Sequence, residues 1–121
     1  MAVLTVTTIT EAGIADGAVA AAGGGDSFAN PEDERTILKV INGGGGAITV
    51  TITPANASAT GVPGFGDLTK ANAGGSVGAG ATRYFGPFPG RTFNDTNGRV
   101  AVTYSGVTTV TVAALRVPKR G

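Results

Sequence analysis

The sequence lacks histidine, cysteine and tryptophan altogether. Without histidine the chain has no imidazole base and lacks the commonest metal ligand, and without cysteine it has neither thiolate chemistry nor a disulfide framework. The reactive groups that remain are eight carboxylates, nine lysines and arginines, two tyrosines and the hydroxyl side chains. No motif gathers them into a nucleophile with its base or into a metal cluster. We therefore expect no enzyme activity, no cofactor and no bound metal.

Strong charge and long apolar runs are also missing. A formal net charge of +1 gives no field that would attract nucleic acid or a membrane surface. No apolar run approaches the roughly 20 residues of a membrane helix. The opening MAVLTVTTITEAG has no basic leader followed by an apolar segment, so we expect a chain that is not visibly exported. The absence of disulfides is compatible with a reducing cytoplasm.

Glycine, in contrast, is abundant, with 21 residues among 121, beside 6 prolines. A chain of this length can bury roughly two-thirds of its unfolded surface, and its content of Leu, Ile, Val and Phe is above that of disordered chains. The sequence therefore predicts one folded domain over residues 1–121, with long glycine-rich loops.

Apolar and β-branched residues alternate with a period of two. In AITVTITP, Ile48, Val50 and Ile52 alternate with threonines, which is the pattern of a half-buried strand. Strands are predicted at 3–10, 35–42, 47–53, 81–86, 99–105 and 107–117, and the only helix candidate is 14–22. The second and third of these strands form a predicted hairpin across NGGGGA. The last two strands form another hairpin across Gly106, or one feeds directly into the other.

Short strands joined by glycine-rich loops, without the helices of βαβ units, favour an all-β fold, an antiparallel β-sandwich of the jelly-roll kind. Its inner faces should include Val50, Val100, Val102 and Val110. The segments 11–34 and 54–80 are unusually long for loops, so we expect both to be mobile arms in an isolated subunit. The run ANAGGSVGAGA has almost nothing to bury, so we expect it to become ordered only against a partner's surface.

Most of the aromatic and turn residues lie in the stretch RYFGPFPGRTFNDTNGRVAVTYSG. Pro87 and Pro89 fix φ and remove backbone donors, which makes GPFPG a stiff corner. Phe85, Phe88 and Phe93 would each bury a large apolar area, and for most of them the first interpretation is that they fill the core. The alternative is that Phe88 with Pro89 projects as an anchor into a neighbouring subunit.

Polar clusters give weaker signals. FNDTNG places Asn94, Asp95 and Asn97 in one loop, but a calcium loop uses more carboxylates, so we expect an Asx turn that leads into a hairpin. The acidic run DSFANPEDE (26–34) is expected to be solvated, with helix capping or an ion pair between subunits as alternatives. The glycine runs GGGG (43–46) and GGSVGAG (74–80) lack the strand–helix context of a phosphate loop. The spacing of Asp67 and Asp95 does not support a pair of glycosidase carboxylates.

Two segments of the chain resemble small structural proteins of tailed bacteriophages that decorate or cement the capsid. They are GGDSFANPEDERTILKVINGGGGAITVTI (24–52) and RYFGPFPGRTFNDTNGRVAVTYSGVTTVTVAALRV (83–117), about half of the chain. The likeness depends on DSFAN before a strand, on GPFP followed by an FND turn, and on GRVAVTYS with its VTTVTVAALR continuation. The stretch 53–75 matches nothing in that group.

The resemblance implies a protein that is made in the host cytoplasm and binds the outer surface of the virion head. Its partner would be the major capsid protein, and we expect a homo-oligomer, first of all a trimer. The alternatives are another virion component, from the neck, tail or fibre base, and a small carbohydrate-binding sandwich. The absence of Trp and the scarcity of Tyr count against the sugar-binding alternative.

The contact residues are predicted at two places. The region up to about Asn30 would become ordered on binding, and the corner would insert a rigid apolar group. The predicted interface residues are Phe28, Phe85, Pro87, Phe88, Pro89, Arg91 and Phe93.

Overall fold

The computed structural model describes residues 2–31 and 35–118. Within them the elements in chain order are β1 (Ala2–Leu4), β2 (Val6–Thr8), β3 (Val19–Ala20), β4 (Asp26–Ala29), β5 (Thr36–Asn42), β6 (Ile48–Thr53), β7 (Ser58–Val62), β8 (Gly66–Thr69), β9 (Ala73–Val77), β10 (Thr82–Phe85), α1 (Gly90–Phe93), β11 (Arg99–Tyr104) and β12 (Val110–Arg116). No helix in these ranges is long and apolar enough to span a bilayer.

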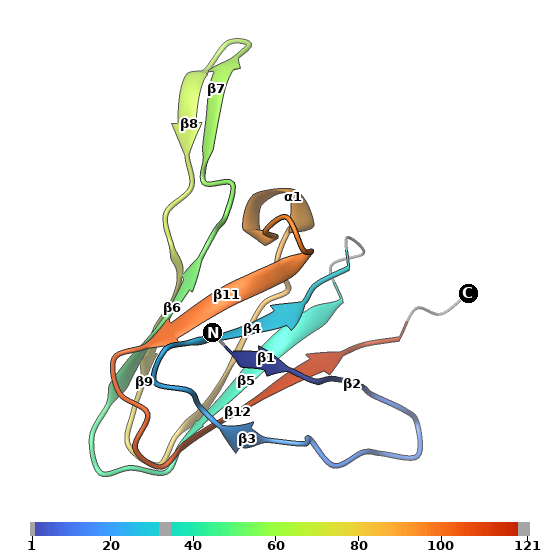
Figure 1. Cartoon of the computed structure of the whole chain (residues 1–121), viewed down its shortest axis with the longest axis vertical. Helices are drawn as coiled ribbons and strands as arrows, with labels where there is room; N and C mark the ends of the chain where they lie inside the picture. Colours follow the sequence, from blue (N-terminus) through green and yellow to red (C-terminus); the bar gives the residue numbers. More distant parts are fainter. Residues whose placement is uncertain (1, 32–34, 119–121) are drawn as a thin grey trace.

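Two sheets packed face to face form the body of the molecule (Figure 1). One has the order β1-β4-β11-β6-β9, and the other has the order β10-β5-β12-β2, with β3 also paired to β12. The predicted β-sandwich is therefore confirmed. The strand order is mixed and not clearly a jelly roll, because β1 runs parallel to β4 and β2 runs parallel to β12.

The predicted first strand is divided between the two sheets. Residues 2–4 pair with β4 in one sheet and residues 6–8 pair with β12 in the other, so the chain passes between the sheets at Thr5. The N-terminal residues thus belong to both layers. The expectation that this region waits for a partner before it becomes ordered is wrong for residues 2–8.

The two predicted hairpins are also wrong, although their strands are present. β5 and β6 lie in different sheets, and so do β11 and β12, so each connection is an arch between layers. Sheets in a sandwich lie about 10 Å apart, and glycine-rich linkers cross that distance readily. The two arches contact each other where Gly43 N–H donates to the Thr109 carbonyl at 2.9 Å.

Inward-facing residues of both sheets form the core. Along β5, buried and half-buried residues alternate strictly. The predicted core valines are confirmed as buried, namely Val50, Val100, Val102 and Val110. They share the core with Leu38, Val40, Ile52, Val77, Val112 and the phenylalanines of the corner.

The predicted long loops contain regular structure. Within 11–34, β4 lies between β1 and β11, and within the helix candidate 14–22 residues 19–20 form β3 instead. Gly17 in the middle of that segment costs about 1 kcal/mol of helix stability relative to alanine, whereas β12 offers backbone partners. Within 54–80, residues 58–69 form the β7–β8 hairpin, and Ala73–Val77 form β9.

The glycine-rich strand β9 becomes ordered without any partner protein. It pairs with β6 from Ile48↔Val77 to Ile52↔Ala73, and Val77 is fully buried. Backbone hydrogen bonds to an already formed strand replace the side-chain burial that the sequence lacks. The expectation that ANAGGSVGAGA needs an external surface is therefore wrong for residues 73–77.

Gly74 should be irreplaceable in this strand. Its φ is +113°, and a Cβ there would meet the Val50 carbonyl oxygen, so Gly74→Ala should lower the free energy of unfolding by more than about 2 kcal/mol. Gly45→Ala is the matched control, since a Cβ at Gly45 meets no atom within 4 Å. Its unfolding free energy should stay within about 0.5 kcal/mol of wild type in urea denaturation. Equal effects of the two changes would refute this account of β9.

Candidate interaction surface

The phenylalanines of the corner pack on one another inside the sandwich. The Phe88 ring lies 5.9 Å from that of Phe28 and 5.3 Å from that of Phe93, centroid to centroid, and both pairs are tilted. These are favourable distances and angles for aromatic pairs. Phe88 is only 3% exposed, and Phe28, Phe85 and Phe93 are also buried. The core interpretation of these rings is thus confirmed.

Two asparagines close the corner over these rings. Asn30 donates from Nδ2 to the Phe88 carbonyl at 3.0 Å and to Asn94 Oδ1 at 2.8 Å, and Asn94 Nδ2 donates to the Asn30 carbonyl at 2.6 Å. Asn30 is completely buried. The DSFAN, GPFP and FND strings, which are far apart in the sequence, therefore meet at one place.

The burial of these rings corrects part of the predicted interface. Phe28, Phe85, Phe88 and Phe93 are used inside the chain, because the core otherwise contains only aliphatic side chains of moderate size. Phe88 therefore does not project as an anchor. Of the predicted contact residues, Pro87, Pro89 and Arg91 are exposed.

Truncation of Phe88 should accordingly lower the unfolding free energy strongly, whereas truncation of Arg91 should hardly change it. Phe88→Ala removes a buried ring and should cost about 3–5 kcal/mol of unfolding free energy. Arg91→Ala removes an exposed side chain and should change stability by less than about 0.5 kcal/mol. Thermal and urea unfolding of the two single variants measure the difference, and a stable, fully folded Phe88→Ala protein would contradict the buried corner.

Asp95 organises the turn that follows the corner. Its Oδ1 accepts hydrogen bonds from the backbone N–H of Asn97 at 2.8 Å and of Arg99 at 3.1 Å. This is the predicted Asx turn. It delivers the chain into β11, which pairs with β4 and β6 and so lies inside a sheet.

Asp26 does not belong to a solvated acidic cluster as predicted. It is buried on β4, where Oδ2 accepts from the Tyr104 hydroxyl at 2.8 Å and from the Ala22 N–H at 3.2 Å. Burial, and then the hydrogen bond to Asp26, raises the pKa of Tyr104 far above its ordinary value. The other acidic residues of that run, Glu32, Asp33 and Glu34, lie outside the described residues.

The raised pKa of Tyr104 predicts a loss of stability in alkali. Unfolded tyrosine releases its proton near pH 10, whereas folded Tyr104 retains it, so unfolding releases a proton above that pH. The unfolding free energy should therefore fall by up to about 1.4 kcal/mol per pH unit between about pH 10 and 12. Tyr104→Phe should cost roughly 1–3 kcal/mol at neutral pH and make the alkaline fall shallower. Equal slopes of unfolding free energy against pH for wild type and Tyr104→Phe would contradict this.

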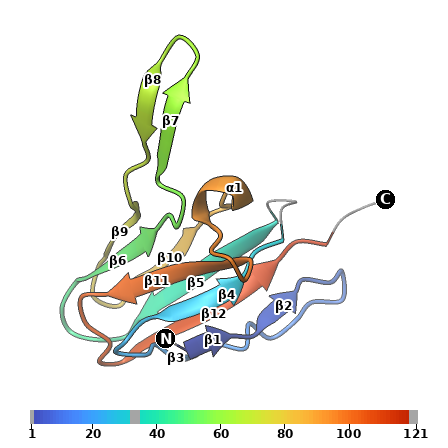
Figure 2. The ribbon, with the colours of Figure 1, turned by 45° about the horizontal axis from the view of Figure 1, so that its top comes forward.

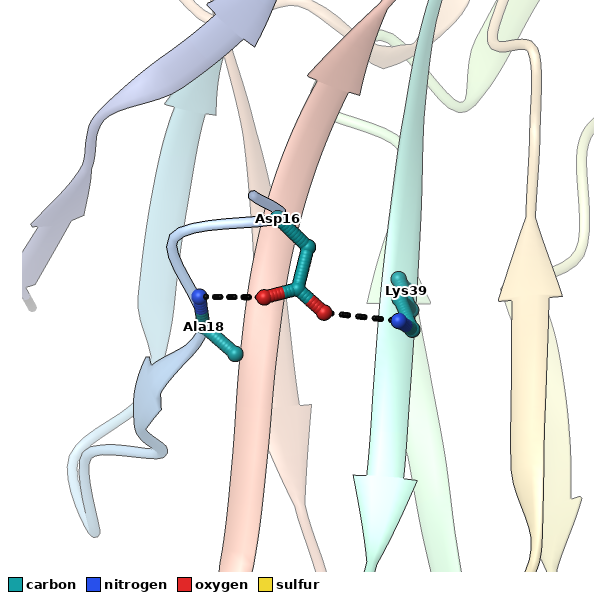
Figure 3. A network of polar contacts seen from close by, with 3 residues as sticks. All are labelled: Asp16, Ala18 and Lys39. Atoms are coloured by element: carbon teal, nitrogen blue, oxygen red, sulfur yellow. Dashed lines mark hydrogen bonds and ion pairs between the residues drawn. The ribbon is translucent and has the colours of Figure 1, made fainter. Parts of the chain in front are cut away.

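A second carboxylate fixes the segment between β2 and β3 (Figure 3). Asp16 Oδ2 lies 2.7 Å from Lys39 Nζ, on the outer face of β5, and Asp16 Oδ1 accepts from the Ala18 N–H at 3.1 Å. The hydrogen bond from Lys39 lowers the pKa of Asp16, and the same bond raises the pKa of Lys39. This ion pair holds the segment across the second sheet.

The most prominent surface feature is the hairpin that we call the arm, residues 58–69. In Figures 1 and 2 it projects beyond the end of the sandwich where α1 lies. Gly61, Gly64 and Gly66 all have positive φ around the turn, and Asp67 Oδ1 accepts from the Gly61 N–H at 3.0 Å. This hairpin is not among the elements predicted from the sequence. Pro63-Gly64, a turn dipeptide between two short runs, was the available signal.

The base of the arm is fastened to α1. Asn56 donates from Nδ2 to the Arg91 carbonyl at 3.0 Å and to the Asn94 carbonyl at 3.1 Å, and its N–H donates to the Thr92 carbonyl at 2.9 Å. Lys70 N–H donates to the Ala57 carbonyl at 2.6 Å, which closes the two ends of the arm. The base therefore has a fixed position on the corner.

Two hollows flank this base, and together we call them the base groove. The first, of about 360 Å³, lies between Lys70, Ala73, Gly86, Pro87, Phe88, Pro89, Thr92 and Phe93. The second, of about 390 Å³, lies between Asn56, Ala57, Leu68, Thr69, Lys70 and Thr92. Lys70 and Thr92 line both. The groove is mainly apolar, and its charged lining residue is Lys70. Arg91, which precedes Thr92 in α1, is exposed.

Acidic residues do not assemble into a metal site in the described ranges, where no three His, Cys, Asp or Glu side chains form a group that could hold an ion. Asp16, Asp26, Asp67 and Asp95 each accept hydrogen bonds that stabilise local structure.

No family model matches the chain, and no curated protein and no solved structure shows significant similarity to it.

Proposed function

We propose that the protein is a structural component of a phage virion that binds the outer surface of the head and stabilises the shell. The observation that carries the proposal is the arm, a projecting hairpin with an exposed phenylalanine at its turn, attached to a packed sandwich. Phe65 is 74% exposed. A large exposed aromatic residue is a feature of interaction sites.

The end of the sandwich that bears the arm is the proposed contact region, for neighbouring copies of the chain as well as for the capsid protein. The arm, the exposed prolines of the corner, Arg91 and the base groove all lie there. This placement retains the exposed part of the interface predicted from the sequence and adds the arm. The phage resemblance was found in DSFAN, GPFP and FND, the same strings that build this end.

The chemistry of the chain fits adhesion better than turnover. Histidine and cysteine are absent, and the carboxylates described above act as structural hydrogen-bond acceptors. A decoration protein needs none of these groups as catalysts. Several copies that each contact neighbouring capsid subunits oppose shell rearrangement through many weak contacts, so that avidity replaces affinity. We propose a homo-oligomer, first of all a trimer, whose partner is the major capsid protein.

Binding to isolated heads tests this proposal. Purified wild-type protein is added to heads from which decoration proteins have been stripped and, separately, to purified tails. Sedimentation then measures the bound protein, and DNA release on heating measures head stability. The protein should bind heads with saturation and raise the temperature of DNA release.

Two results would contradict the proposal. Binding to tails and not to heads would favour the neck, tail or fibre-base alternative. Binding to neither would exclude the virion role, and glycan binding would then favour the carbohydrate module.

A further inference from the structure

Phe65 differs from the other four phenylalanines, which are all buried. It lies in the turn between β7 and β8, where Val62 pairs with Gly66. Covering an aromatic ring that is mostly exposed to water is favourable, because it removes apolar surface from water. The tip of the arm is therefore the part of the described chain that most needs a partner.

The base groove has the size and chemistry to receive such a ring. Its first hollow, of about 360 Å³, is lined by Pro87, Phe88, Pro89 and Phe93, and a phenylalanine side chain is small enough to enter it. Aromatic rings pack well on prolines and on other rings. Lys70 already lies 5.9 Å from the centroid of the Phe93 ring, so a cation stands at the rim.

The tip cannot reach the groove of its own chain. The paired strands β7 and β8 hold Phe65 in the turn at the far end of the arm, while the groove lies at the base of the same arm. Figure 2 shows how far the arm projects from the sandwich. A strand of five residues spans about 17 Å, so the strand pairing would have to break before the tip could fold back. Occupancy of the groove by a tip requires a second molecule.

Charge complementarity favours a second copy of this chain as that molecule. Asp67 is the only charged residue of the arm, and it lies two residues from Phe65. The receiving groove carries Lys70 at its rim and Arg91 on the adjoining helix. A tip that places its ring in the hollow therefore brings a carboxylate near two cations.

We propose that the arm of one copy inserts Phe65 into the base groove of the next copy, with Asp67 facing Lys70 and Arg91. Each chain then gives one arm and receives one, so the interface is head-to-tail. Such an interface closes into a ring when the rotation between copies allows it and otherwise forms a filament. The inference deepens the proposed function and rests on it for its biological setting, because it names the contact that joins copies on the shell.

Sedimentation velocity of the purified full chain tests the contact without any phage head. Wild type should self-associate, and Phe65→Ala should weaken the association roughly tenfold or more, because the variant lacks the inserted ring. Asp67→Asn keeps the acceptor for the Gly61 N–H and removes the charge. It should therefore weaken association less than Phe65→Ala does, and it should abolish most of the salt dependence of the association. Tyr84→Ala is the matched control, since this aromatic residue is 59% exposed on β10, away from the arm. It should associate like wild type.

Complementation between two defective variants tests the head-to-tail arrangement. Thr92→Trp fills the groove and leaves the arm intact, while Phe65→Ala leaves the groove intact and lacks the ring. Each variant alone should be monomeric, and their mixture should form pairs of one copy each, because one good arm meets one good groove. Circular dichroism and thermal unfolding confirm that both variants are folded.

Three results would overturn the inference. They are wild-type protein that stays monomeric up to about 1 mM, Phe65→Ala that associates as wild type does, and variants that fail to pair on mixing. These outcomes are separable from failure of the proposed function. A monomer that still decorates heads refutes only the arm contact, and an oligomer that binds neither heads nor tails refutes only the virion role.

Discussion

The packing of Phe28, Phe88 and Phe93 under the Asn30–Asn94 hydrogen bonds is the interaction on which the rest of this structure depends. It joins the end of β4 to the corner before α1 and so fixes where α1 lies. Asn56 then fastens the arm to α1 through three backbone carbonyls. Phe88 and Phe93 also line the base groove. One cluster thus determines the position of every exposed feature that we assign to binding.

The structure separates a well-packed body from the end that we propose for binding. In the body, valines from two sheets interdigitate, and the arches and the N-terminal crossing connect the layers. At the other end, a two-stranded hairpin presents Phe65 and Leu68 to solvent. A hairpin of this size has little stability by itself, and its attachment at Asn56 and Lys70 provides what the strands lack. This division suits a protein that must bind repeatedly across a regular surface while it resists unfolding.

The sequence predicted the strands well and their partners poorly. Period-two alternation marks Ile48–Thr53 and Arg99–Tyr104 clearly, because one face of each strand is buried. It carries no information on which sheet a strand joins, so two arches were predicted as hairpins.

Strand β9 escaped prediction because its order comes from backbone pairing with β6. The corner was found from its prolines and rings, but whether Phe88 faces inward depends on Phe28 and Asn30, some 60 positions earlier. The arm was missed because Phe65 and Leu68 are exposed and β8 has no buried face that would produce a period-two pattern.

A cryo-electron microscopy map of a decorated head would test the central claim most directly, because it shows both the location of the protein and the partner of each arm. The account predicts this sandwich on the outer surface, with the β7–β8 hairpin of each copy entering the groove beside α1 of its neighbour. Arms that end in solvent or in the capsid protein, with the base grooves of neighbouring copies unfilled, would contradict it.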